Sequence, residues 1–355
     1  MPKKLKNIWS EFVSYDNLLY GYREASRGKR HFPSIAAFTL HLEDRLYDLR
    51  ERLQSGNWHP DKYRCFEIYE PKKRTIHAPA FGDRVVHHAL VHVIGPRIES
   101  AFIDHSYACR VGKGTHAASK YLWSMLKSAR DTMGDRVYVL KADISKYFYS
   151  IDHQILKSQL ARKISDRRVL IVCGRLIDES PCGSDVGLPL GCLTSQLWAN
   201  MYLDQFDHFA KDVLGLRYYV RYMDDFVILH HDKAALWNLL ARIREYLTEA
   251  LHLVLNRKTG IYQASQGVDF AGYRHWASHI LPRKRNIQAA KNRFAWMTNA
   301  YPEELIDLDQ VRSSVASFVG YTQHCKGWVS TTSALERLVI RPGPVERERK
   351  DGPHK

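Results

Sequence analysis

The sequence lacks several features that mark common protein classes. Its six cysteines include no C-x-x-C pair, which disfavours a structural zinc site or a disulfide framework and favours reduced thiols. It has no run of 18 or more apolar residues, and no apolar segment follows its basic start. We therefore expect a soluble, cytoplasmic protein with no membrane span and no secretory signal.

Acidic residues are scarce relative to basic ones. Among 355 residues, 53 are Lys or Arg and 38 are Asp or Glu, which gives a formal net charge of +15. Such a surplus raises the local concentration of polyanions, so nucleic acid is the expected partner. Hydrophobic residues make up 45% of the chain, which is enough to bury the cores of two or three domains and excludes wholesale disorder.

Periodicity predicts the order of the secondary structure elements. Helical spacing predicts one helix over residues 34–55, ended at Gly56. Alternating residues over 63–69 and a basic run over 74–78 predict a β-hairpin with its turn at 70–73. Further helices are expected from Asp83, Thr115, Asp152 and Thr194 and over 234–251, and strands over 137–140, around Leu253 and over 268–273.

Three acids in the middle of the chain stand at the ends of predicted strands. The strand over 137–140 runs into Asp143, while Asp224 and Asp225 lie at the bend between β-rich runs 217–221 and 226–229. Carboxylates gathered on neighbouring strands repel one another and are stable together chiefly around cations. Oxygen ligands favour Mg²⁺ or Mn²⁺, and two such ions form the clamp used for in-line phosphoryl transfer. A lone Asp-Asp pair would be only a solvated turn.

Three segments in fixed order now support a family resemblance. With Asp143-Ile-Ser-Lys-Tyr-Phe148, Tyr222-Met-Asp-Asp225 and Asp269-Phe-Ala-Gly-Tyr273, the chain resembles reverse transcriptases from about residue 60 to about residue 330. The resemblance implies catalytic roles for Asp143, Asp224 and Asp225, with a weaker or structural role for Asp225. It implies that these acids and Ile144 form a site for two Mg²⁺ ions, or Mn²⁺.

The resemblance also implies a fold and a division of the chain. The fold would be α+β, a right-hand polymerase whose fingers and palm comprise an antiparallel sheet backed by helices, followed by a short helical thumb. The expected parts are an N-terminal helical extension (1–60), fingers (61–135), palm (136–280), helical thumb (281–340) and disordered tail (341–355).

Basic and loop residues supply the expected substrate contacts. Arg or Lys on a mobile hairpin would neutralise the triphosphate of the incoming nucleotide, and Phe148 stands at the family's steric gate against a ribose 2′-hydroxyl. The predicted nucleotide-binding residues are Lys72, Arg74, Arg84, Phe148, Leu190, Gly191 and Gln196. The predicted nucleic-acid contacts are Arg110, Lys113, Arg283, Lys284 and Arg285, for which a merely solvated surface is the alternative.

One loop indicates a subfamily. Where most reverse transcriptases carry Gln-Gly followed by Ser-Pro, the run Leu188-Pro-Leu-Gly-Cys-Leu-Thr-Ser-Gln196 has Leu190 and Gln196. This pair resembles the enzymes of diversity-generating retroelements, and so do the segments at 106–116 and 83–89. That resemblance implies adenine-mutagenised cDNA copied from a template-repeat RNA, in a bacterial, archaeal or phage-encoded system. The implied partners are template RNA, primer and cDNA, dNTPs, structured retroelement RNA and a small basic pentameric accessory protein.

Two alternatives stay open at this stage. The chain could be a retron-like or group II intron-like reverse transcriptase in which Leu190 and Gln196 are neutral substitutions. It could also be a non-catalytic RNA-binding scaffold derived from a polymerase fold, although all three acids and the gate aromatic are present.

Overall fold

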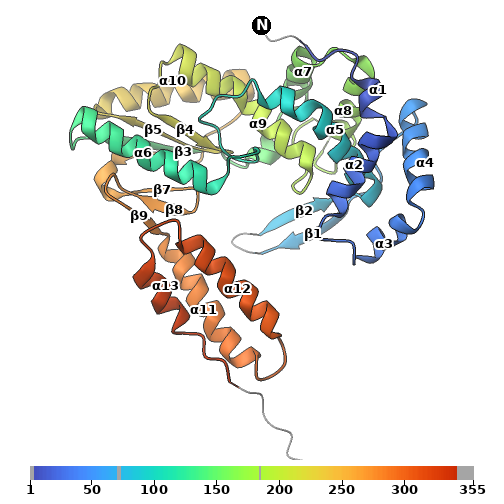
Figure 1. Ribbon diagram of the computed structural model, residues 1–355. Helices are drawn as coiled ribbons and strands as arrows, with labels where there is room; N and C mark the ends of the chain where they lie inside the picture. The colour runs from blue at the N-terminus through green and yellow to red at the C-terminus, as the bar shows by residue number, and fades with distance from the viewer. Residues whose placement is uncertain (1–3, 70–72, 184, 342–355) are drawn as a thin grey trace, which may run out of the picture. The chain divides into compact units, whose positions relative to one another are not determined.

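The computed structural model describes residues 4–69, 73–183 and 185–341 (Figure 1). The chain divides into two compact units. The first unit comprises the residues up to Gly114 together with Leu140–Ile261, and the second comprises Thr115–Val139 together with the residues from Tyr262. No helix of the described residues is long and apolar enough to cross a membrane. The predicted tail lies almost wholly outside the described residues.

The first unit contains most of the helices. Helix α2 (Tyr15–Ser26) packs against α5 (Phe81–Glu99), and α5 packs against α9 (Leu193–His208), in which twelve residues are buried. Its other helices are α1 (Trp9–Phe12), α3 (Pro33–Leu40), α4 (Leu42–Gln54), η1 (Tyr147–Ser150), α7 (His153–Lys163), α8 (Arg167–Asp178), the π-helix η2 (Phe209–Val213) and α10 (Lys233–Leu251).

An antiparallel hairpin forms the predicted basic ribbon. Strand β1 (Arg64–Ile68) pairs with β2 (Arg74–Ala78), with Arg64 opposite Ala78 and Ile68 opposite Arg74. The hairpin prediction is confirmed for both strands. Residues 70–72 of its predicted turn, which include Lys72, lie outside the described residues.

A four-stranded sheet carries the acids, in the order β4-β5-β3-β6. Its strands are β4 (Tyr219–Tyr222), β5 (Asp225–His230), β3 (Tyr138–Asp143) and β6 (Gly260–Gln263), and the division between the units falls within β3 and β6. Strands β4 and β5 are antiparallel, and Tyr222 pairs with Asp225 across the tight turn. Aromatic packing of Phe206 on Phe226, with ring centroids 5.0 Å apart, joins α9 to the sheet.

The second unit combines a small sheet with a helical bundle. Strands β7 (Val268–Phe270), β8 (Tyr273–His275) and β9 (Ile280–Pro282) form one antiparallel sheet, and α6 (Thr115–Met133) contacts β8, where Ser119 Oγ and His275 Nε2 lie 2.8 Å apart. The short η3 turn is Ala264–Gln266. Helices α11 (Lys284–Ala300), α12 (Leu308–Thr322) and α13 (Trp328–Leu335) lie side by side around Phe294 and Phe318 (Figure 1).

Several predicted boundaries were wrong. The single helix over 34–55 is two helices, because the chain leaves helical geometry at His41, with φ −122° and ψ 40°. Asp83 does not cap α5 but lies in its first turn, where its Oδ2 accepts the Asp61 N–H at 2.8 Å. The run over 268–273 is not one strand, because Ala271 and Gly272 have positive φ and form the turn between β7 and β8. Leu253 is not in a strand.

Candidate active site

The acids meet because their strands are neighbours in one sheet. Asp143 ends β3, and Asp224 stands in the turn immediately before β5, which lies next to β3. The Ile144 N–H donates to the Asp224 carbonyl at 3.2 Å, so the backbone itself joins the two ends. Both carboxyl groups are half-buried at this junction.

Burial and like charge act together on Asp224. Desolvation is the larger cause, and the nearby Asp143 carboxyl adds to it, so the pKa of Asp224 is raised to about 6. An acid held in this way accommodates either a proton or a cation at neutral pH. A bound cation would relieve the repulsion between the two carboxylates.

Two polar contacts that periodicity did not reveal orient these acids. Lys141 Nζ donates to Asp225 Oδ1, which ties the second acid of the pair to a cation on β3. Asn256 donates from Nδ2 to Asp143 Oδ2 at 3.1 Å, and its backbone N–H donates to the Asp143 carbonyl at 2.7 Å. Asp225 is therefore held differently from Asp143 and Asp224.

The acids fit a magnesium site in which the protein supplies few of the ligands. Across the described ranges, no group of three or more His, Cys, Asp or Glu side chains is arranged to hold a metal. Magnesium is commonly bound by one or two carboxylates together with substrate phosphates and water. Asp143 and Asp224 match that ligand number, and water or substrate phosphates would supply the other ligands.

The loop before α9 joins the predicted nucleotide residues. The Leu188 N–H donates to the Phe148 carbonyl at 2.7 Å, and the His77 N–H of β2 donates to the Leu190 carbonyl at 2.9 Å. Gly191 follows with φ +113°, a conformation that favours glycine. Phe148, the hairpin and the loop are thus brought together by backbone hydrogen bonds.

A cavity of about 350 Å³ lies beside this loop. Its lining includes three predicted nucleotide residues, Arg84, Gly191 and Gln196, and two cationic or titratable ones that the sequence patterns did not indicate, Lys29 and His88. The Arg84 Nε donates to the Pro79 carbonyl at 3.1 Å, which fixes the side chain at the start of α5. The volume falls in the range of ligand pockets, about 300–1,000 Å³.

The remaining predicted nucleotide contacts are only partly placed. Arg74 begins β2 and is exposed, whereas Lys72 lies outside the described residues. Lys73 pairs with Glu67 at 2.9 Å. The roles of Arg74 and Lys72 in nucleotide binding stay predictions.

Arg110 and Lys113 hold their own loop together. The Arg110 side chain is 9% exposed, and its Nη1 donates to the carbonyls of Ile103 and Ser106 at 2.7 and 2.9 Å. Lys113 Nζ lies 3.8 Å from Asp104 Oδ1. Their role in nucleic-acid binding stays a prediction, although Arg110 already has a structural one.

The cations after Pro282 lie in the second unit. Lys284 and Arg285 begin α11 and are exposed. Arg283 is more enclosed, with Nε 3.5 Å from Asp269 Oδ1 and its backbone N–H donating to Tyr321 Oη at 3.1 Å. Their binding to nucleic acid also stays a prediction.

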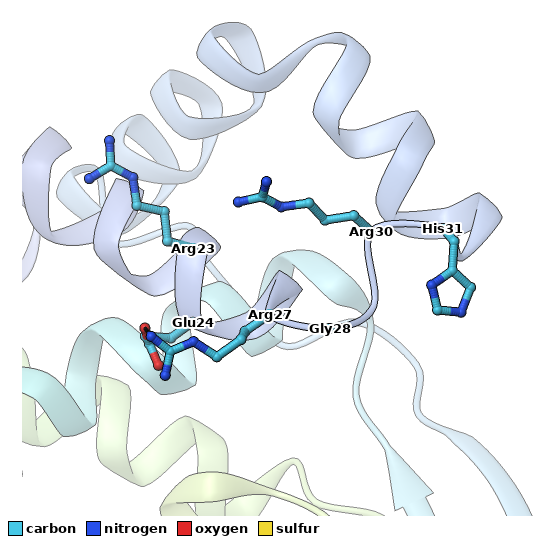
Figure 2. Close-up of a pocket in the computed structure, with 6 residues that line it drawn as sticks. All are labelled: Arg23, Glu24, Arg27, Gly28, Arg30 and His31. Carbon is cyan, nitrogen blue, oxygen red and sulfur yellow. Dashed lines mark ion pairs between the residues drawn. The ribbon is translucent and has the colours of Figure 1, made fainter. Parts of the chain in front are cut away.

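Another basic pocket lies where α2 leads into α3. Figure 2 shows its lining, in which Arg30 extends from the loop toward α2 and Arg27 lies beside Glu24. Arg27 and Glu24 pair at 3.3 Å, so one of the cations is partly neutralised. The pocket measures about 690 Å³ and is lined by Arg23, Glu24, Arg27, Gly28, Arg30 and His31. Sequence reasoning missed it, although the run Arg27-Gly-Lys-Arg-His31 was a usable signal.

Comparison with known proteins decides the family. The model of the reverse transcriptase (RNA-dependent DNA polymerase) family matches residues 67–275, more than half of the chain. The chain belongs to the reverse transcriptase family. The matched range includes Arg74, Arg84 and all three acids.

The curated relatives are distant in sequence. Protein YkfC of Escherichia coli (strain K12) is 28% identical over 273 residues, covering 64% of this chain and 70% of that protein. Group II intron-encoded protein LtrA of Lactococcus lactis subsp. cremoris is 26% identical over 208 residues, covering 56% of this chain and 33% of LtrA. The chain thus matches only a third of the length of LtrA.

A solved structure supports the fold alone. Apo telomerase from Candida tropicalis, truncated from its C-terminal domain, has a TM-score of 0.50 at 12% identity, covering 65% of this chain and 58% of that chain. The predictions of a reverse transcriptase and of an α+β right-hand polymerase fold are confirmed. The subfamily, the site roles and the domain boundaries stay predictions.

Proposed function

We propose that this reverse transcriptase extends a primer on an RNA template by two-metal nucleotidyl transfer. The observation that carries the proposal is the meeting of Asp143, at the end of β3, with Asp224, in the turn before the neighbouring strand β5, where the Ile144 N–H donates to the Asp224 carbonyl at 3.2 Å. Asp225, which accepts from Lys141, has a supporting role. The Ile144 carbonyl is an additional candidate ligand.

The acids would hold the ions, and the chain's other groups would hold the substrate. When bound, two Mg²⁺ ions would activate the primer 3′-hydroxyl and stabilise the leaving pyrophosphate. Asp143 and Asp224 would bind and orient the two ions. Asn256 keeps the Asp143 carboxylate in one position. Arg74 and Arg84 are the proposed triphosphate contacts, and Phe148 excludes a ribose 2′-hydroxyl by its bulk.

Template RNA is the proposed polyanionic partner. The exposed cations of the Figure 2 pocket, Arg23 and Arg30, suit a phosphodiester backbone. In the second unit, Lys284 and Arg285 stand in the first turn of α11, where the helix dipole disfavours positive charge. A bound phosphate would relieve that repulsion. Both places are proposed RNA or primer contacts.

Primer extension tests the polymerase proposal. Wild-type protein should extend a DNA primer on an RNA template with dNTPs and Mg²⁺, and Asp224→Ala should abolish extension while it still binds the template–primer. Lack of extension by the wild type, even with the cognate structured RNA and accessory protein supplied, would instead favour an RNA-binding scaffold.

We further propose that the enzyme belongs to a diversity-generating retroelement and makes adenine-mutagenised cDNA from a template-repeat RNA. Leu190 and Gln196 support this, because an apolar Leu190 cannot donate the hydrogen bonds that Gln would supply near the nascent pair. The Leu190 backbone is held by β2, so the side chain is presented by a fixed loop. Structured retroelement RNA and a small basic pentameric accessory protein would be its partners.

The error spectrum tests this subtype. Leu190→Gln should lower misincorporation opposite adenine by about tenfold, since one hydrogen bond in a dry site is worth about 1–3 kcal/mol. Errors opposite the other three template bases should change little and serve as the internal control. A wild-type enzyme with no excess of errors at adenine would favour an intron-like enzyme, in keeping with the similarity to LtrA.

A further inference from the structure

A fully buried ion pair lies behind the catalytic turn. Arg221 of β4 and Asp207 of α9 are both 0% exposed, and their side chains meet in two hydrogen bonds. Arg221 Nε donates to Asp207 Oδ1 at 2.7 Å, and Nη2 donates to Oδ2 at 2.5 Å. The charge on each side chain is therefore neutralised by its partner in the interior.

The guanidinium group of Arg221 has five N–H donors, and each one has an acceptor. Two serve Asp207. Nη2 also donates to Ser106 Oγ at 3.1 Å, and Nη1 donates to Asn200 Oδ1 at 3.3 Å and to the Met223 carbonyl at 2.8 Å. Because all five directions are used, the planar group has a single orientation that satisfies its surroundings.

The contact with Met223 connects Arg221 to the turn that carries Asp224. Met223 immediately precedes Asp224 and has φ +57°, a left-handed conformation that is unfavourable for a residue with a Cβ. Its carbonyl accepts from Arg221 in a partly buried position, so the hydrogen bond stabilises the turn in this conformation. Asp207 and Asn200 both lie on α9, so Arg221 connects the turn to that helix.

We propose that Arg221 is a positioning residue, which sets the place of the Asp224 carboxylate by holding the Met223 carbonyl against the Asp207 and Asn200 side chains of α9. The inference rests on the proposed polymerase function, but it concerns how the turn is built. The positive charge of Arg221 neutralises Asp207, and the fork of N–H donors lets the same group hydrogen-bond the Met223 carbonyl in the turn. Lysine, a point charge with three donors, cannot reproduce both.

Two variants separate position from stability. Arg221→Lys keeps the charge pair and loses the fork. The double variant Arg221→Met with Asp207→Leu removes both charges, and such replacements of buried ion pairs are often neutral or stabilising. The matched control is Tyr219→Phe, which removes the 2.6 Å hydrogen bond from Tyr219 Oη to Asp207 Oδ1 and leaves Arg221 and Met223 joined.

Three measurements are made on each full-length variant: thermal unfolding, single-nucleotide primer extension, and Mn²⁺ binding by electron paramagnetic resonance with template–primer present and no dNTP. Both test variants should lose about 100-fold in kcat and bind Mn²⁺ about tenfold more weakly, as expected for a displaced supporting contact. Affinity for template–primer should not change. Tyr219→Phe should lower the unfolding temperature only.

Wild-type kcat and Mn²⁺ affinity in a folded Arg221→Lys or double variant would overturn the proposal. It would also fail if Tyr219→Phe lowered kcat as much as Arg221→Lys, or if neither test variant folded, because the pair would then serve stability alone. If wild type extended no primer, the proposed function would fail separately, and Mn²⁺ binding would still report on the turn.

Discussion

Asn256 is bonded twice to Asp143, through its backbone N–H to the Asp143 carbonyl at 2.7 Å and through Nδ2 to Oδ2 at 3.1 Å. Its own Oδ1 accepts the Lys258 N–H at 3.0 Å, so the residue also organises the turn that follows. One side chain thus connects Asp143, a proposed metal ligand, to a turn 113 positions later in the chain.

Loss of the Asn256 amide should slow the chemical step. Asn256→Asp can still accept the Lys258 N–H, but it loses the donor to Asp143 and places a third carboxylate beside it. We expect kcat for single-nucleotide addition to fall by roughly 10- to 100-fold, the equivalent of ~1–3 kcal/mol. Asn256→Ala, which also removes the hydrogen bond to Lys258, should in addition unfold at a lower temperature. Unchanged kcat in both variants would contradict a role for this side chain.

Stability without metal should depend on pH through Asp224. Its folded pKa of about 6 lies above the ordinary value of 3.8, so between these values the folded chain binds more protons than the unfolded chain. The Asp224 contribution to stability is therefore present at low pH and is lost as pH rises through about 6. The difference in unfolding temperature between wild type and Asp224→Asn, measured without metal as a function of pH, isolates this contribution.

Magnesium should reverse that loss. Above pH 6 the deprotonated acids can bind Mg²⁺, so added Mg²⁺ should raise the unfolding temperature of wild type more at pH 7.5 than at pH 5, the two test conditions chosen on either side of about pH 6. Asp224→Asn should show a much smaller increase at either pH. An equal effect of Mg²⁺ on both proteins would argue against a cation at these acids.

The Figure 2 pocket should contribute to RNA affinity through charge. The double variant Arg23→Glu with Arg30→Glu should bind template RNA more weakly and should reduce the slope of log K against log salt by about 0.7 for each phosphate that the pocket no longer binds. Arg242→Glu with Arg244→Glu, on the exposed face of α10, makes the same change in net charge elsewhere. Equal reductions in affinity in the two double variants would mean that net charge alone acts.

Gly191 should tolerate no side chain. A Cβ there would lie 3.2 Å from Ile76 Cγ2 and 3.3 Å from the His77 carbonyl oxygen, and φ is already +113°. Gly191→Ala should therefore displace the loop that carries Leu190 and raise the KM for dNTP by roughly tenfold, for a strain of ~1–3 kcal/mol.

The matched control for this change is Gly174→Ala within α8, where a Cβ would have no neighbour within 4 Å. It should stabilise the protein by about 0.5–1 kcal/mol, because alanine restricts the unfolded chain and favours the helix. Its KM for dNTP should equal that of wild type. A wild-type KM for dNTP in Gly191→Ala would show that the loop accommodates the added methyl group.

Local patterns predicted the parts of the site that depend on local conformation. The tight turn between β4 and β5 was recognisable because Asp224 and Asp225 separate two β-rich runs, and Asp152 was recognisable at the start of α7, where its Oδ1 accepts from Gln154 and Ile155. The break at His41 was missed because the apolar spacing continues through it.

Tertiary partners could not be predicted in this way. A count of cations cannot distinguish Arg30, exposed in a pocket, from Arg110, which donates to carbonyls of its own loop. Nor did any spacing connect Lys141 with Asp225 or Asn256 with Asp143, since these contacts arise where distant strands and turns come together.

The sequence by itself determined the positive charge, the two hairpins, the acids at strand ends and the family to which the chain belongs. Each of these follows from composition, from residues adjacent in the chain, or from ordered motifs. The tertiary structure decided how the acids are held, because the pKa of Asp224 and the contacts of Arg221 depend on burial and on groups brought from elsewhere. Desolvation and hydrogen-bond geometry act only in the folded protein.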